Sequence, residues 1–449
     1  MAQLALLGGK QTVTEDVRGA NGRWPWYSYV TPEGKALVNQ IMDEQTLSEH
    51  RVIREFEKAF RDYVGAKFSL SFCTGTASIM TGLFGMGIGR GDEVIVPSYT
   101  FFATCTPVMA LGGIPVFADV DLETRTLDPV DIERKITPKT KAIVVVHVHG
   151  NPADMDAIMA IAKKYDLKVL EDCSHAHGSK YKGKYVGTIG HVGCFSLQAS
   201  KLLYGGEAGI MVTNDENIYA RTAAHSSYER FYPSYYEEVG LSPDNDYIKY
   251  AITGLACKLR AHPLAIAIAH CELPHLDEQN AIRNALGKRL DDGIADIPYL
   301  HPFKVLEGAE RMNSYHMLRY DAEDNNGIWR ETFLRALSAE GVQGGLDGYG
   351  TLHKQPAFTQ LDDNWPKCYP DGVVKDLGEL PVSEYLGSAC ILGAPRFEDM
   401  DRVVCIDQYI EAYHKVHNAT DELLKYQKDH EEELAAMRPK GGRTINRVK

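Results

Sequence analysis

Lys201 and Asp172 are the residues of this chain whose types and positions best suit covalent chemistry. Lys201 follows a predicted buried strand in CFSLQASKLLYGG and precedes a glycine-rich turn. Burial there would lower the pKa of its amine, so that a free amine is available to react with an aldehyde. Asp172 ends the predicted strand LKVLED, where a carboxylate can pair with a protonated ring nitrogen. Each also has an ordinary interpretation, because lysines are common on surface loops and aspartates often cap the element that follows a strand.

A possible phosphate site lies at Thr74, Gly75 and Thr76, where the strand FSLSFC turns into a helix. Backbone N–H groups and the positive end of a helix suit a dianion, and small residues let it approach. Ser196, five residues before Lys201, could donate its hydroxyl to the same anion. Any strand-to-helix turn can contain such a sequence by chance. An amine, an acid and a phosphate cradle together are what pyridoxal phosphate requires.

These residues lie at the ends of short apolar strands that alternate with helices. Such alternation predicts a mostly parallel sheet covered on both faces, with its site at the strand ends. The predicted strands are FSLSFC (68–73), DEVIVP (92–97), IPVFADV (114–120), KAIVVVHVHG (141–150), LKVLED (167–172) and VGCFSL (192–197), and helices are predicted over 74–87, 98–112 and 154–166.

The regular alternation weakens past residue 265, which predicts a second, smaller α+β domain. Amphipathic helices are predicted there over 330–342 and 398–416. The chain then becomes strongly charged, first as a solvated helix and finally as a basic tail. We predict an N-terminal arm (1–35), a large cofactor-binding domain (36–265, opening with a broken helix over 36–63), a small C-terminal domain (266–415), and a charged helix and tail (416–449).

The composition predicts a soluble cytoplasmic protein. The formal net charge of −13 argues against a nucleic-acid partner. Nine cysteines without a CxxC pair indicate reduced thiols rather than a disulfide framework, and no metal site is predicted. We find neither an export signal nor an apolar run long enough to span a membrane.

Five segments match a known pattern almost continuously from residue 50 to 215. In length and order they resemble the DegT/DnrJ/StrS family of sugar aminotransferases, a branch of the fold-type-I pyridoxal-phosphate enzymes. The segments are FSLSFCTGTASIMTGLFGMGIGRGDEVIVPSYTFFAT, GGIPVFADVDLETRTLDP, ITPKTKAIVVVHVHGNPADMDAI, VLEDCSHAHGSKYKGKYVG and CFSLQASKLLYGGEAGIMVT. The opening LALLGGKQ, the WPWY cluster and the SLQASK…GGEAG run are most similar to a subgroup that includes scyllo-inosose aminotransferases and 3-amino-5-hydroxybenzoate synthases.

The resemblance implies a role for each matched position. Lys201 stands where the family lysine forms a Schiff base with the cofactor, and Asp172 where an acid pairs with the pyridinium nitrogen. Phe101 stands where an aromatic ring stacks on the cofactor, and His175 where a Gln or His covers it. The phosphate-binding positions are matched by Gly75, Thr76 and Ser196.

Near the end of the large domain the sequence departs from the family pattern. The family often reads G-x-N-Y-R-M there, and its Asn reaches the phosphate of a neighbouring subunit. This chain has Ala256 at the Asn position and Lys258 at the basic position, with Arg260 close by. We expect Lys258 to replace the missing contact from the neighbouring subunit. The alternative is that water fills the gap and these cations pair with surface carboxylates.

A second departure lies in the small domain and leaves the acceptor open. The family's HYP-like segment is replaced here by Asp347, Gly348 and Tyr349. The sequence does not identify the ketone that is accepted or decide whether it carries a nucleotide.

The resemblance implies an α/β fold-type-I enzyme with a seven-stranded, mostly parallel sheet and homodimeric, shared active sites. It implies ping-pong transfer of an amino group from glutamate or glutamine, through pyridoxamine phosphate, to a keto-sugar or keto-cyclitol. One alternative is a sugar dehydratase of the same family, in which histidine replaces the lysine, and Lys201 argues against it. A non-catalytic cofactor-binding sensor would need a reader domain, and a dinucleotide enzyme would need a GxGxxG turn after its first strand.

Overall fold

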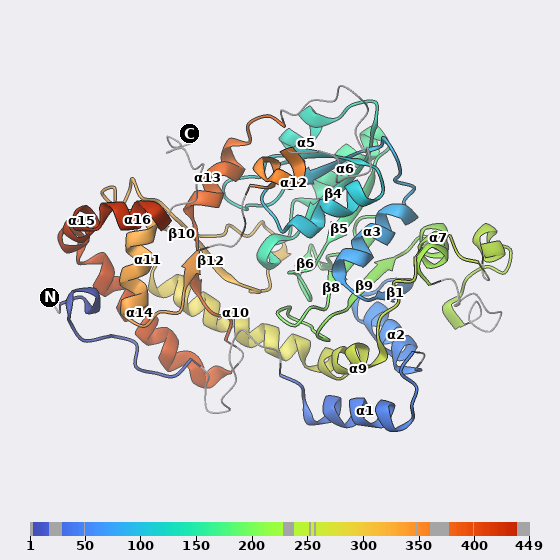
Figure 1. Ribbon diagram of the computed structural model, residues 1–449, viewed down its shortest axis with the longest axis horizontal. Helices are drawn as coiled ribbons and strands as arrows, with labels where there is room; N and C mark the ends of the chain where they lie inside the picture. The colour runs from blue at the N-terminus through green and yellow to red at the C-terminus, as the bar shows by residue number, and fades with distance from the viewer. Residues whose placement is uncertain are drawn as a thin grey trace.

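A computed structural model of the 449-residue chain gives the arrangement of its elements (Figure 1). It describes residues 3–17, 29–48, 50–227, 238–250, 253–255, 257–346, 349, 351–359, 377–397 and 399–437. No helix among these residues is both long enough and apolar enough to cross a membrane.

A seven-stranded sheet forms the centre of the larger part of the molecule. Six strands run in one direction, and β9 is antiparallel to both of its neighbours. In spatial order the strands are β1 (Phe68–Phe72), β9 (Gly209–Thr213), β8 (Val192–Ser196), β5 (Lys168–Asp172), β4 (Thr140–Val146), β2 (Glu93–Pro97) and β3 (Ile114–Ala118). The predicted mostly parallel sheet is therefore confirmed. Strand β9 was not among the strands predicted from the sequence.

Helices cover both faces of this sheet, because successive side chains of each buried strand point to opposite faces. In β5, Val169 packs into one core and Leu170 into the other. The first core is covered by α1 (Pro32–Asp43), α2 (Val52–Val64), α5 (Pro129–Lys135), α6 (Met155–Tyr165) and α9 (Pro263–Glu272). The second is covered by α3 (Gly75–Gly85), α4 (Thr106–Ala110) and α7 (Glu216–Ser226).

A smaller antiparallel sheet organises the C-terminal half. Its strands are β10 (Leu300–Pro302), β12 (His316–Tyr320), β14 (Cys390–Ala394) and β13 (Gly345–Leu346). Around it lie α10 (Leu276–Gly293), α11 (Arg330–Ala339), α13 (Pro381–Ala389), α14 (Val403–His417), α15 (Thr420–Asp429) and α16 (Glu431–Met437) (Figure 1). The short helix α12 (Pro356–Thr359) instead places Phe358 in the second core of the large sheet. Leu4, Val13 and Val17 from the N-terminal segment join the hydrophobic core of this half.

The two halves are connected by a three-stranded sheet and by the passage from α9 to α10. The three-stranded sheet pairs β11 (Ala309–Glu310) with β6 (Lys180–Tyr181), which in turn pairs with β7 (Lys184–Tyr185). Segments far apart in the sequence therefore meet beside the carboxyl ends of the large sheet's strands.

The helix predicted over residues 98–112 is wrong at its start. Residues 98–101 are not helical, and a 3-10 turn at Phe102–Thr104 precedes the short helix α4. The Ser98 backbone instead pairs with residues far along the chain, since it donates to Ala118 (3.3 Å) and accepts from Leu352 (3.1 Å). These long-range hydrogen bonds outweigh the local preference for a helix.

Candidate active site

The predicted phosphate turn brings Gly75 and Ser196 into contact at the start of α3. The Thr74 side chain caps this helix by accepting a hydrogen bond from the Ala77 N–H at 3.0 Å. A Cβ added at Gly75 would lie 2.6 Å from the Ser196 Cβ, so only glycine permits this approach. Thr76 follows on the exposed side of the first turn. The result is a set of backbone N–H groups with a hydroxyl beside them, which fits a phosphate.

Lys201 lies in the loop that connects β8 with the antiparallel strand β9. Its backbone N–H donates to Gln198 O at 2.9 Å, which fixes the start of this loop. Burial lowers the pKa of the Lys201 amine below its ordinary value, while Tyr315 and Asp172 act in the opposite direction. The amine therefore loses its proton more readily than an exposed lysine does, and it lies within the electrostatic reach of Asp172.

Asp172 is 4% exposed at the end of β5, and its two carboxylate oxygens have different partners. Oδ1 accepts from the Ser174 N–H at 3.1 Å, which is the local capping contact expected for an aspartate after a strand. Oδ2 accepts from the Thr104 hydroxyl at 2.8 Å, across 68 residues of sequence. Thr104 in turn lies 3.2 Å from the Thr100 hydroxyl. The hydroxyl-rich segment around residue 100 supports the acid, a role that the sequence analysis had missed.

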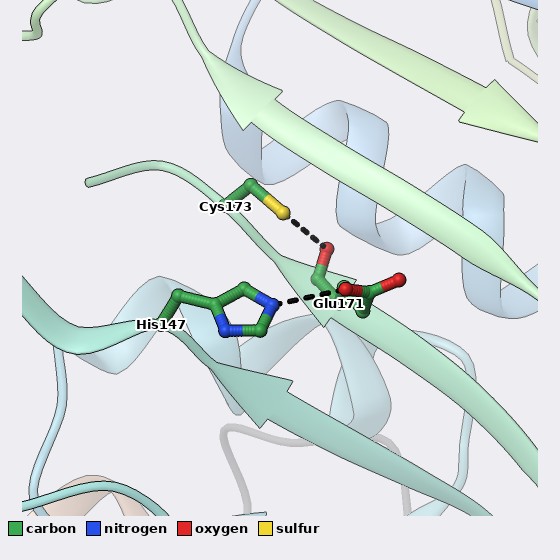
Figure 2. A group of neighbouring side chains, drawn as sticks. All are labelled: His147, Glu171 and Cys173. Atoms are coloured by element: carbon green, nitrogen blue, oxygen red, sulfur yellow. Dashed lines mark hydrogen bonds and ion pairs between the residues drawn. The ribbon is translucent and has the colours of Figure 1, made fainter. Parts of the chain in front are cut away.

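Glu171, the residue before Asp172, fixes the end of β5 through several hydrogen bonds. Figure 2 shows His147 and Cys173 directed toward Glu171, which is fully buried. The carboxylate accepts from His147 Nε2 at 3.0 Å and from the backbone N–H groups of Gly187 (2.8 Å), Ile189 (2.8 Å) and Gly190 (2.6 Å).

These hydrogen bonds occupy the atoms that a metal ion would need. His147 Nδ1 accepts from the Ala153 N–H at 3.1 Å, so the ring proton lies on Nε2 toward Glu171. Burial, with the nearby Glu171 and Asp172 carboxylates, raises the pKa of the Cys173 thiol well above its ordinary value. The cluster is thus a hydrogen-bonded support that fixes the strand carrying Asp172.

His175 belongs to a stack of rings beside Lys201. Its ring lies parallel to that of His149, with centroids 5.6 Å apart, and the Tyr315 ring stands edge-on to both. The Tyr349 hydroxyl lies 2.9 Å from His175 Nε2. Burial lowers the pKa of His149 and of His175 well below the ordinary range, so both rings are neutral at pH 7. The sequence analysis had missed His149 and Tyr315; the histidines of HVHG at the end of a strand were the available signal.

Phe101 and Lys258 remain on the outside of this single chain. Phe101 is 46% exposed and contacts the neighbouring Phe102, with ring centroids 4.3 Å apart. Lys258 is exposed, and the next residue, Leu259, accepts a hydrogen bond from the Cys73 N–H at 2.9 Å. The segment therefore runs along the phosphate turn of its own chain. The expected roles of both residues stay predictions, and Ala256, Asp347 and Gly348 lie outside the described residues.

The residues that are brought together fit the cofactor that the sequence pattern predicts. They provide a desolvated amine at Lys201, a supported carboxylate at Asp172 and an anion cradle at Gly75 and Ser196. The neutral imidazoles of His149 and His175 lie within electrostatic reach of Lys201. An amine, an acid and a phosphate site match an aldehyde that also carries a pyridine nitrogen and a phosphate.

Comparisons with known proteins agree with this geometry. The model of the DegT/DnrJ/EryC1/StrS aminotransferase family matches residues 29–387. A Micromonospora echinospora protein described as a putative L-glutamine:3-amino-2,3-dideoxy-scyllo-inosose aminotransferase is 30% identical over 391 residues, covering 85% of this chain and 89% of that protein.

Solved structures show the same fold. An aminotransferase from Psychrobacter cryohalolentis superimposes with a TM-score of 0.76 at 27% identity, covering 88% of this chain and 99% of the other. A 3-amino-5-hydroxybenzoic acid synthase gives a TM-score of 0.71 at 25% identity, with coverages of 87% and 98%. Because the family match extends over most of both halves, this chain belongs to the DegT/DnrJ/EryC1/StrS aminotransferase family, whose cofactor is pyridoxal 5'-phosphate.

Proposed function

We propose that this aminotransferase moves an amino group from L-glutamine or L-glutamate to a keto-sugar or keto-cyclitol. The observation that carries the residue roles is the desolvated Lys201 amine within reach of an Asp172 carboxylate that Thr104 holds in place. The name of the Micromonospora relative supports a glutamine donor and a cyclitol acceptor. The stacked rings of His149, His175 and Tyr349 offer neutral hydrogen-bonding groups of the kind that a polyhydroxylated acceptor needs.

When bound, pyridoxal phosphate supplies an electron sink for the carbon that loses its proton. Lys201 would hold the cofactor's aldehyde carbon, and its freed Nζ would take the proton from the donor's α-carbon and deliver it to that former aldehyde carbon. Asp172 would keep a proton on the pyridine nitrogen, because its Oδ2 is already oriented by the Thr104 hydroxyl. His175 would cover one side of the ring and exclude water.

The remaining assignments complete this proposal. Gly75, Thr76 and Ser196 would bind the phosphate, and Phe101 would stack on the cofactor ring. Lys258 would reach the phosphate of a partner subunit in a cytoplasmic homodimer. The chain would be divided into an N-terminal arm (1–35), a large domain (36–265), a small domain (266–415) and a charged helix and tail (416–449).

The test follows the bound cofactor by absorbance through each half of the reaction. L-Glutamine or L-glutamate should abolish the visible band of the aldehyde form and produce the near-ultraviolet band of the aminated form. A panel of keto-sugars and inososes should then restore the visible band. Failure of both amino acids to convert the cofactor would refute the proposed donor, and failure of the whole panel would refute the acceptor class.

A further inference from the structure

A segment of the C-terminal half, residues 351–354, lies against the loop that leaves β2 of the large sheet. Tyr99 and Thr351 form an antiparallel β-bridge, and the Leu352 N–H donates to the Ser98 carbonyl at 3.1 Å. The Leu352 side chain is buried in the second core of the large sheet. The backbone of this segment is therefore joined directly to the residues that follow β2.

His353 adds a side-chain connection between the same two segments. It is 2% exposed, and its Nδ1 lies 2.6 Å from the Ser98 hydroxyl, while its Nε2 lies 3.2 Å from Glu384 Oε1. Burial lowers the pKa of His353 below its ordinary value, although Glu384 acts in the opposite direction, so the ring is neutral at pH 7. Because a carboxylate only accepts, Nε2 carries the ring proton, and Nδ1 accepts from the Ser98 hydroxyl.

The carboxylate of Glu384 is itself held in place. Its Oε2 pairs with Lys354. Burial alone would raise the pKa of Glu384, but the hydrogen bonds from Lys354 and the imidazole keep it below its ordinary value. The helix α13 that carries Glu384 is anchored by Asp119, directly after β3, which accepts from the backbone N–H groups of Val382 (3.0 Å) and Ser383 (2.7 Å). The group that orients the imidazole is therefore fixed relative to the large sheet.

The two joined segments each carry a group of the candidate active site. In the stretch that follows β2, the Thr104 hydroxyl donates to Asp172 at 2.8 Å. Ahead of residues 351–354, the Tyr349 hydroxyl lies 2.9 Å from His175 Nε2. Because the segments are joined beside these groups, a change at the junction moves the groups that support the acid and the stacked rings.

We propose that His353 is a positioning residue for amino transfer: by accepting a hydrogen bond from Ser98, it keeps the Thr104 hydroxyl oriented toward Asp172. This inference rests on the proposed function, because it matters to the rate only if Asp172 assists the reaction. A displacement of about 1 Å in a supporting group can cost on the order of 100-fold in rate, even when the change lies far from the reacting atoms. The Glu384 contact orients the ring, whereas the Ser98 contact carries the effect to the site.

The experiment compares two substitutions that each keep one half of the hydrogen bonds made by His353. His353→Asn keeps an amide oxygen near the Nδ1 position, which can accept from Ser98, whereas His353→Gln keeps an N–H near Nε2 for Glu384. The rate of the donor half-reaction is measured in single turnovers with L-glutamine and L-glutamate. We expect His353→Asn to stay within about threefold of the wild type and His353→Gln to be slower by about tenfold. The reverse order would overturn the proposal, because it would assign the effect to the Glu384 anchor.

A double-mutant cycle tests whether the effect passes through Thr104. Ser98→Ala removes the donated hydrogen bond with a small change in volume, so it also serves if the His353 variants do not fold. Alone it should slow the donor half-reaction by about tenfold, and added to Thr104→Val it should cause less than about a twofold further loss. A loss of stability alone would not produce this coupling. Fully multiplicative losses would show that Ser98 and Thr104 act independently and would overturn the proposal.

His417→Gln is the matched control. His417 Nδ1 also lies 3.1 Å from a hydroxyl, that of Tyr299, but His417 ends α14 and contacts the hydrophobic core of the C-terminal half. Its loss should leave the rate of the donor half-reaction and the effect of Thr104→Val unchanged. A tenfold slower control would show that any lost histidine contact slows the enzyme, and it would count against a specific role of His353.

Hydrogen exchange of the apoenzyme supplies a readout that does not depend on turnover. Backbone amides of residues 98–104 should exchange faster in His353→Gln and Ser98→Ala than in the wild type, and at the wild-type rate in His417→Gln. Wild-type donor rates in His353→Gln and Ser98→Ala would overturn this inference while leaving the aminotransferase intact. If neither amino acid converts the cofactor of the wild type, the proposed donor fails, and unchanged exchange in both variants then refutes the inference separately.

Discussion

The two sides of the site differ in how completely their polar groups are satisfied. On the large-sheet side, Asp172 and Glu171 have hydrogen-bond partners at both carboxylate oxygens. On the side facing the small sheet, Nε and Nη1 of the buried Arg125 and both ring nitrogens of the buried His149 have no hydrogen-bond partner among the described residues. Both residues also have a positive φ. The chain's own hydrogen bonds therefore hold the carboxylates of the first side, whereas the polar atoms of Arg125 and His149 are not held in this way by the described residues.

The largest effect should come from Lys201→Ala. The variant lacks the amine that would hold the cofactor and move the proton, so turnover should fall by at least about 10⁴-fold. Cofactor binding through the phosphate and ring contacts should persist, as measured by fluorescence titration of the apoenzyme. Transamination that survives in this variant would refute the assignment of Lys201.

The next largest effect should come from Asp172→Asn, which tests the role of the Asp172 charge. The amide keeps the shape but loses the charge that holds the ring proton, so the rate of the donor half-reaction should fall by about 10²- to 10³-fold. Thermal unfolding should change little. Thr104→Val, which removes the hydroxyl that orients Oδ2, should give a smaller loss of the same kind. Near-wild-type rates in Asp172→Asn would refute a catalytic role for this residue. Its only remaining role would be structural, as the acceptor of the Ser174 N–H.

Gly75→Val should weaken the cofactor site without removing a reactive group. A Cβ at this position would lie 2.6 Å from Ser196 Cβ and 2.8 Å from its Cα, so the cradle must open. The dissociation constant for pyridoxal phosphate should rise by about tenfold or more, which corresponds to roughly 1.4 kcal/mol. Gly89→Ala is the control, since no atom lies within 4 Å of its added Cβ. Equal affinity in both variants would place the phosphate elsewhere.

The buried histidines near Lys201 predict how the free energy of unfolding of the apoenzyme depends on pH. Burial keeps the pKa of His149 and His175 well below 6.5 and lowers that of His177 to about 3. Below about pH 6.5 the unfolded chain binds protons that the folded chain does not, so the free energy of unfolding should fall as pH drops from 6.5 toward 3. Above pH 6.5 these groups should have no effect.

Denaturant titrations across this range measure that dependence. Each buried histidine should contribute a slope of about 1.4 kcal/mol per pH unit once its unfolded form is protonated. His177→Phe should make the slope shallower, whereas His275→Gln, at an exposed position, should leave it unchanged. Identical slopes in all three proteins would show that the buried imidazoles do not control acid stability.

Lys258→Met should have the smallest effect. If this lysine reaches the phosphate of a partner subunit, the affinity for pyridoxal phosphate should fall by about three- to tenfold, and the loss should diminish at high salt. Unchanged affinity, or a dimer structure in which Lys258 points away from the phosphate, would favour the alternative that water fills the gap left by Ala256.

The sequence by itself determined the architecture of the large sheet and its chemical groups. Short apolar runs such as LKVLED and VGCFSL contain enough consecutive buried residues to specify strands β5 and β8. Lys201, Asp172 and the Gly75 turn could be chosen because each stands directly beside such a run. The order and spacing of these residues together matched a family pattern. None of them was specific enough to indicate the family alone.

Only the tertiary structure decided which distant side chains meet. Thr104 reaches Asp172 across 68 residues, and Tyr349 reaches His175 across 174. The break in the predicted helix at residues 98–101 has the same origin, because Ser98 accepts its hydrogen bond from Leu352. Arg125 illustrates the limit most clearly, since in the sequence it is one charged residue of a turn. Local periodicity reports which face of an element is buried, but the partner across an interface depends on how the whole chain folds back on itself.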